Sequence, residues 1–223
     1  MQPTYLPWAG YFNLIQNADI FVFLDDVQFE KQSWQNRNKI IIGSKEHWLS
    51  IPIKRKGLAT TIKNVVVDDT QKWRKKHIAA ISQNYCGSEH YNKLKLVLDI
   101  INDSAQSNLA DINMNIINAL CKILLIKKEF IRSSELACPG TRSEKLVNII
   151  KKLNCNRYLS PIGSKNYIEN DAVFCKTDID IDYQNYKVKD YKQKNINSFI
   201  SHLSIIDVIA NLGISDAQHY ISG

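Results

Sequence analysis

Two adjacent carboxylates follow an apolar run near the start of the chain. The run Ile20–Leu24 leads directly into Asp25 and Asp26. A continuous apolar run is typical of a strand buried on both faces in a parallel sheet, and ligands bind at the carboxyl ends of such strands. Asp25 and Asp26 are therefore candidate catalytic residues, because a carboxylate there could act as a general base, hold an amine or bind a metal. Adjacent side chains on an extended chain point to opposite faces, so we expect one of the two at most to face a given ligand. The alternative is a helix cap or a turn, where Asp is common.

A guanidinium lies a few residues further on, among planar polar side chains. Arg37 is flanked by Trp34, Asn36 and Asn38 in the segment WQNRN. An arginine in this setting could clamp a phosphate with two parallel hydrogen bonds. Arg37 could equally form an intramolecular ion pair with Asp25 or Asp26.

The opening segment QPTYLPW also has two interpretations. Gln2 offers an amide for recognition, and Tyr5 with Trp8 could form a stacking wall. Alternatively, the prolines set an extended entry to a helix over 8–17 and the aromatic rings fill the core.

A second polar turn, between Ser160 and Ser164, follows a predicted short strand over 157–160. Backbone amides and hydroxyls in such a turn could cradle an anion, but with one glycine an ordinary turn is the simpler interpretation.

Several common site motifs are absent from the sequence. The glycines are too widely spaced for a dinucleotide or phosphate loop, and the five cysteines form no Cys-x-x-Cys pair. The histidines share no metal-ligand spacing, so no metal site is expected. His77, on a predicted helix with Trp73, is interpreted as a packed or surface histidine.

Charge and hydropathy narrow the partners and the location. The net charge is +7, yet residues 1–30 contain acids and neither Lys nor Arg. A basic body around an acidic opening segment could attract anionic small molecules, nucleotides included. The simpler interpretation is that scattered lysines solvate helices and strand edges. The basic clusters lack interleaved aromatics, so nucleic acid is an unlikely partner. No apolar run reaches the roughly 20 residues of a membrane span, and no positively charged leader precedes an apolar segment, so we expect a cytoplasmic protein.

The elements that must position these residues alternate between strand and helix patterns, which indicates an α/β fold in a single domain over 1–223. The predicted strands are 20–24, a hairpin of 39–42 with 48–53, 62–67, 129–133, 157–160 and 173–183. A helical block is expected over 70–128, and further helices after a capping-box pattern at 141–144 and over 204–212, ending at Gly213.

Three stretches, QPTYLPWAGYF (2–12), FVFLDDVQF (21–29) and SWQNRNKI (33–40), resemble the WbqC-like family. Weaker matches, at 73–77, 158–160, 191–193 and 203–213, extend the resemblance over nearly the whole chain. The family is associated with bacterial O-antigen and other surface-polysaccharide gene clusters. By a looser analogy with adenylate-binding enzymes, the fold is expected to be a mostly parallel Rossmann-like sheet flanked by helices.

The resemblance implies a transferase that adds an acyl or aminoacyl group to the amine of a nucleotide-linked amino sugar. Asp25 or Asp26 would deprotonate or orient that amine, Arg37 would hold a phosphate, and Tyr5 with Trp8 would stack on the sugar or base. The other implied substrate contacts are Gln2, Gln28, Trp34, Asn36, Asn38, Ser160 and Ser164. A nucleotide or an activated acyl donor is the implied cosubstrate, and a homo-oligomer is left open. The alternative is a non-catalytic protein that binds the nucleotide sugar or acts as a scaffold.

Two features depart from the family pattern. Family members usually begin with a short apolar strand ahead of the Gln-Pro pair, whereas in this sequence Met1 stands directly before Gln2 and Pro3. The segment after Ser160 is commonly Gly-rich in relatives, but here Pro161 and Ile162 intervene.

Overall fold

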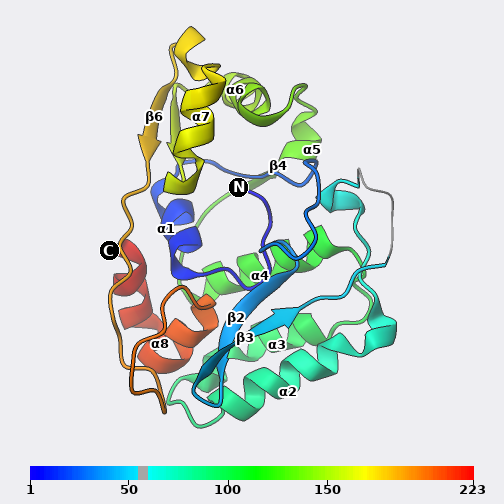
Figure 1. Cartoon of the computed structure of the whole chain (residues 1–223), viewed down its shortest axis with the longest axis vertical. Helices are drawn as coiled ribbons and strands as arrows, with labels where there is room; N and C mark the ends of the chain where they lie inside the picture. The colour runs from blue at the N-terminus through cyan, green and yellow to red at the C-terminus, as the bar shows by residue number, and fades with distance from the viewer. Residues whose placement is uncertain (55–59) are drawn as a thin grey trace.

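The computed structural model describes residues 1–54 and 60–223 as a mixture of helices and short strands (Figure 1). The α-helices in this part are α1 (Ala9–Asn17), α2 (Trp73–Tyr85), α3 (Lys95–Asn102), α4 (Leu109–Ile123), α5 (Ser133–Leu136), α6 (Arg142–Lys152), α7 (Lys165–Asp171) and α8 (Ile205–Ser222). The strands are β1 (Phe21–Phe23), β2 (Arg37–Ile42), β3 (Lys45–Ser50), β4 (Phe130–Arg132), β5 (Arg157–Ser160) and β6 (Asp180–Tyr183).

The named strands of the described chain pair two by two. β1 runs parallel to β4 and β5 runs parallel to β6, whereas β2 and β3 form an antiparallel hairpin. The hairpin turn is Gly43-Ser44, with φ of 54° and 67°, as a two-residue turn that fits the twist of the strands requires. The α/β class with parallel strands is confirmed. A single Rossmann-like sheet is not confirmed, because β1 with β4 and β5 with β6 form separate two-stranded sheets in the described residues. Residues of β1 and β5 line a groove of about 580 Å³.

The predicted helical block contains α2, α3 and α4: α3 packs against both α2 and α4, and α2 also contacts β2. α4 buries one apolar face, including Ile112, Ile116 and Leu120, in the main core. A smaller apolar cluster forms at the opposite end of the molecule, where α6 and α7 cover β5 and β6 (Figure 1). Among the described helices, none combines the length and the apolar character needed to span a bilayer.

The opening segment passes through the interior before α1 begins. The Asn38 side-chain amide donates to the carbonyls of Tyr5 at 3.1 Å and Leu6 at 2.7 Å, and that of Asn113 donates to the Pro3 carbonyl at 3.1 Å. These bonds satisfy buried backbone carbonyls that belong to no regular element, and they hold Leu6 at a φ of 44°. Met1 lies beside β1, donating to Val22 and accepting from Leu24.

Three predicted elements differ from the structure. The run 62–67 forms a 3₁₀ turn at Ile62–Asn64 and isolated bridges instead of a strand, since Ile62, Val65 and Val67 serve to fill the core. Residues 173–183 begin with a 3₁₀ turn, and the strand is confined to β6. The last helix breaks at Gly213, whose φ is 79°, but resumes to Ser222. The α6 helix is present, although its N-cap Thr141 makes no capping hydrogen bond.

Asp207 fixes the irregular segment between β6 and α8. This fully buried carboxyl accepts hydrogen bonds from the hydroxyls of Tyr85 and Tyr191 and from the Gln193 amide. Burial raises the pKa of Asp207, and the hydrogen bonds from these three donors act in the opposite direction.

Candidate active site

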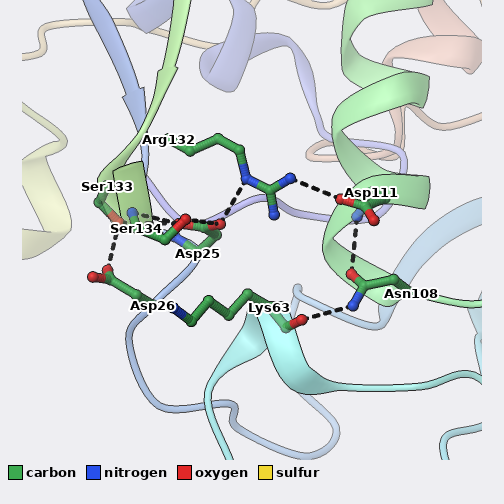
Figure 2. Close-up of polar contacts among 8 residues, drawn as sticks. All are labelled: Asp25, Asp26, Lys63, Asn108, Asp111, Arg132, Ser133 and Ser134. Atoms are coloured by element: carbon green, nitrogen blue, oxygen red, sulfur yellow. Dashed lines mark hydrogen bonds and ion pairs between the residues drawn. The ribbon is translucent and has the colours of Figure 1, made fainter. Parts of the chain in front are cut away.

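The two predicted carboxylates lie where β1 and β4 end, because the parallel pairing brings the carboxyl ends of both strands together (Figure 2). Asp25 comes two residues after the end of β1, and β4 ends at Arg132, which leads into Ser133 and Ser134. The fully buried Asp25 carboxylate accepts from Arg132 Nε at 2.8 Å, from Ser134 N at 3.0 Å and from Ser134 Oγ at 2.8 Å. Internal donors therefore occupy both of its oxygens.

Asp26 faces a different set of partners. Its carboxylate accepts from Lys145 Nζ of α6 at 2.8 Å and from Ser133 Oγ. The Ser133 hydroxyl also lies 3.3 Å from Asp25, but it has one proton and the contact with Asp26 is shorter, so it donates to Asp26. The side chain of Asp26 is 14% exposed. Adjacent aspartates thus bind separate cations and share one serine between them.

Arg132 carries the network from Asp25 to α4. Its second nitrogen donates to Asp111 Oδ1 at 3.0 Å. The Asp111 backbone N–H donates to Asn108 Oδ1, and the Asn108 side-chain amide donates to the Lys63 carbonyl. Figure 2 shows these contacts from Asp25 through Arg132, Asp111 and Asn108 to Lys63. The Lys63 N–H donates to the Asp25 carbonyl at 2.7 Å, which closes a ring of polar contacts. We call these five residues the charged ring.

The charged ring opens to solvent at Asp111. A hollow of about 610 Å³ is lined there by Asp111, Arg132 and Glu135, together with the amides of Asn115 and Asn118. The Asp111 side chain is 46% exposed, whereas that of Asp25 is 0% exposed. Of the ring's carboxylates, Asp111 is therefore the one with oxygen surface left for a ligand.

Electrostatics distinguishes the buried members. Burial alone raises the pKa of Asp25, but the hydrogen bonds from Arg132 and Ser134 outweigh it and hold that pKa below its ordinary value. Burial likewise lowers the pKa of Arg132, and the bond to Asp25 more than reverses this. Both groups are charged at neutral pH, so Asp25 is a poor proton acceptor.

Arg37 lies in a second place, a cleft of about 890 Å³ that we call the hairpin cleft. The cleft is bounded by residues 28–32, the β2–β3 hairpin and α2, and its lining includes Gln28, Asn36, Arg37, Trp73, Lys76 and His77. The Arg37 guanidinium stacks over the Trp48 ring at 4.3 Å. The ion pair between Arg37 and one of the aspartates is not formed, because Asp25 pairs with Arg132 and Asp26 with Lys145.

His77 forms a neutral wall of the hairpin cleft. Burial lowers the pKa of His77 to about 4, so the ring is uncharged at pH 7. One ring nitrogen faces the Ser50 backbone, and Nδ1 accepts from the Tyr5 hydroxyl at 2.9 Å. Tyr5 is fully buried, and its ring packs edge-on against Trp73. Tyr5, predicted to stack on a ligand, is therefore buried and instead contacts two residues that line the cleft, His77 and Trp73.

The remaining predicted contacts are dispersed. Trp8 covers Gly10 and packs against Tyr186 and His202, while Trp34 is 45% exposed and stacks on Trp48. The Gln2 carbonyl accepts from the Tyr11 hydroxyl, and Asn38 holds the opening segment as described above. Ser160 donates to the Pro161 carbonyl, to which the Ser164 N–H also donates, as in an ordinary turn.

Sequence reasoning missed Arg132, Ser133, Asp111 and Lys145. The first two are the last residues of the strand predicted over 129–133, so the rule that identified Asp25 at a strand end applied to them as well. Asp111 and Lys145 lie on helices, where the sequence carries no signal that separates them from other surface charges.

Comparison with known proteins supports the resemblance along the whole chain. The model of the WbqC-like protein family matches residues 2–219. The chain is also 30% identical, over 226 residues, to Uncharacterized protein Rv1507c of Mycobacterium tuberculosis (strain ATCC 25618 / H37Rv), an alignment that covers 99% of this chain and 95% of the relative. No solved structure matches. The chain belongs to the WbqC-like protein family.

Proposed function

We propose that the chain is a transferase that moves an acyl or aminoacyl group onto the amine of a nucleotide-linked amino sugar, in the synthesis of O-antigen or a related surface polysaccharide. The observation that carries this proposal is the charged ring, which opens at Asp111 on a hollow large enough for a sugar. A carboxylate rim with neighbouring amides suits a ligand that has one amine and several hydroxyls.

In the proposed reaction the sugar nitrogen attacks the carbonyl carbon of the activated donor. A new C–N bond forms, the bond from the carbonyl carbon to the donor's oxygen or sulfur breaks, and the leaving group departs with that electron pair. The nitrogen loses a proton to a carboxylate, and Asp111 is the exposed one. Asp25 and Asp26 act as positioning residues, because Asp25 fixes Arg132 and Asp26 fixes Ser133.

The wider context of the proposal is a cytoplasmic enzyme with a Rossmann-like relation between its two parallel strand pairs. The five cysteines are free, which is common in proteins of a reducing compartment. Placement of the charged ring beyond the ends of parallel strands agrees with where ligands bind in open α/β sheets.

A coupled assay with mass spectrometry tests the proposal. Purified protein is incubated with uridine- and thymidine-diphosphate amino sugars and with acyl or aminoacyl thioesters. The mass of the sugar product is then measured. We expect a mass gain of one acyl group that disappears in Asp111→Asn and persists in Asp182→Asn, which removes an exposed carboxylate of β6. Full product formation by Asp111→Asn would contradict the assigned role.

A non-catalytic role in binding or scaffolding remains the second candidate. It is favoured by one observation, namely that Asp25 and Asp26 are both engaged by internal cations. This alternative predicts that nucleotide sugars bind while none of the donor and acceptor pairs yields a product.

A further inference from the structure

In the described structure the hairpin cleft shares no lining residue with the hollow at Asp111. The segment 25–28 nevertheless connects the charged ring, at Asp25, to the cleft, at Gln28. Asp26 contributes to the cluster at the end of β1, and Gln28 lines the cleft two residues later. Two residues span at most about 7 Å of extended chain. Residues 26–28 therefore connect the Lys145 and Ser133 contacts of Asp26 to the lining of the cleft.

Two buried polar atoms at the cleft lack hydrogen-bond partners in the described structure. Asn36 Oδ1 accepts no bond, although the residue is only 6% exposed and its amide nitrogen donates to the Ile51 carbonyl at 3.0 Å. Arg37 Nε, on the next residue, is likewise buried and unpaired. Such atoms are rare in folded proteins because leaving them unpaired is costly. They offer one acceptor and one charged donor to a bound molecule.

The charge and the lining of the hairpin cleft indicate what that molecule is. Three cations, Arg37, Lys31 and Lys76, line it with one carboxylate, that of Glu30. Stacking on Trp48 fixes the Arg37 guanidinium before any ligand arrives. Apolar surface from Phe29, Ile53 and other residues completes the lining, and a volume of about 890 Å³ far exceeds that of a lone phosphate.

We infer that the hairpin cleft binds a nucleoside diphosphate, with its phosphate oxygens against Arg37 and Lys76 and a hydroxyl or N–H of the nucleoside donating to Asn36 Oδ1. This inference rests on the proposed function, whose substrate is nucleotide-linked, and it assigns that substrate's nucleotide to a site. His77 contributes shape to this site and adds no charge.

Calorimetric titration with uridine, adenosine, guanosine and cytidine diphosphates tests the inference on the full chain. Lys76 lines the cleft whereas its neighbour Lys75, also exposed on α2, does not, so Lys76→Gln and Lys75→Gln form a matched pair. We expect at least one diphosphate to bind, with roughly threefold weaker binding in Lys76→Gln and unchanged binding in Lys75→Gln. Arg37→Gln should weaken binding by about tenfold or more, since it removes a charge-assisted pair of bonds.

Several results would overturn the inference. These are the absence of binding by all four diphosphates, equal losses in the two lysine variants, or equally tight binding of inorganic phosphate alone. Thermal melting of each variant checks that it is folded, and Lys76→Gln changes only an exposed side chain. Binding that depends on Arg37 without any acyl transfer would leave the cleft assignment intact and remove the transferase. Acyl transfer by Arg37→Gln with an unchanged KM for the nucleotide sugar would support the transferase and remove the cleft as its nucleotide site.

Discussion

The charged ring and the hairpin cleft are both polar, but they differ in how completely their groups are paired. Asp25 receives three internal donors and is fully buried, whereas Asn36 and Arg37 each keep a buried atom without a partner among the described residues. A buried charge that is fully paired stabilises one arrangement of the chain. Unpaired buried atoms next to a large cleft instead indicate a place for a ligand. The fully paired, buried part of the charged ring at Asp25 is therefore framework, whereas the hairpin cleft has the character of a binding site.

The largest effect should follow from breaking the ring at Asp25. We expect Asp25→Asn to lower the free energy of unfolding by about 3 kcal/mol, because it leaves the Arg132 guanidinium with one carboxylate instead of two. Urea denaturation measures this change. A loss below about 1 kcal/mol would mean that the ring is not the framework that its bonding suggests.

A second effect should come from acid, at the wall of the cleft. The pKa of His77 is lowered to about 4 in the folded chain and is near 6.5 when unfolded. The unfolded chain therefore binds a proton first as the pH falls, and stability present above pH 6.5 is lost between pH 6.5 and 4. We expect this residue to account for about 2 kcal/mol between pH 7 and pH 5. Denaturation of the wild type and His77→Gln at both pH values checks this, and equal losses in the two proteins would contradict it.

A smaller effect on stability is expected at Arg37. Since its Nε has no partner, Arg37→Gln should lose mainly the stacking on Trp48, worth about 0.5–1 kcal/mol. The same urea experiment applies, with the ligand absent. If Arg37→Gln proved as destabilising as Asp25→Asn, the contrast between the two places would fail.

The smallest effect should occur at the exposed pair Arg157–Asp182, whose side chains are 68% and 52% exposed. We expect Arg157→Gln to change the free energy of unfolding by less than about 0.5 kcal/mol. A loss as large as that of Asp25→Asn would show that exposed ion pairs stabilise this chain as much as buried ones, and would contradict the ranking of the two.

Local patterns predicted the parts of the fold that depend on neighbours in sequence. The hairpin at Gly43-Ser44, the helical block and the position of Asp25 at a strand end all follow from periodicity and turn chemistry. The partner of Asp25 lies 107 residues away, and no local pattern states which strand will lie beside β1. The run 62–67 shows the reverse problem, because its β-branched residues fill the core without forming a ladder.

The predicted site residues divide in the same way. Arg37, Asn36 and Gln28 line one cleft, as their closeness in sequence allowed, but Tyr5 and Asn38 turned inward to hold the opening segment. Whether a polar side chain faces a ligand or a buried carbonyl depends on how distant segments pack. No local pattern in the sequence states which distant segments will pack together, so none states which way these side chains face.

A crystal structure of the protein soaked with uridine diphosphate would test the central claim most directly. The account predicts phosphate oxygens within hydrogen-bond distance of Arg37 in the hairpin cleft, with the bonds from Asp25 to Arg132 and Ser134 unchanged. A diphosphate that binds at the charged ring and displaces Arg132 from Asp25 would contradict it.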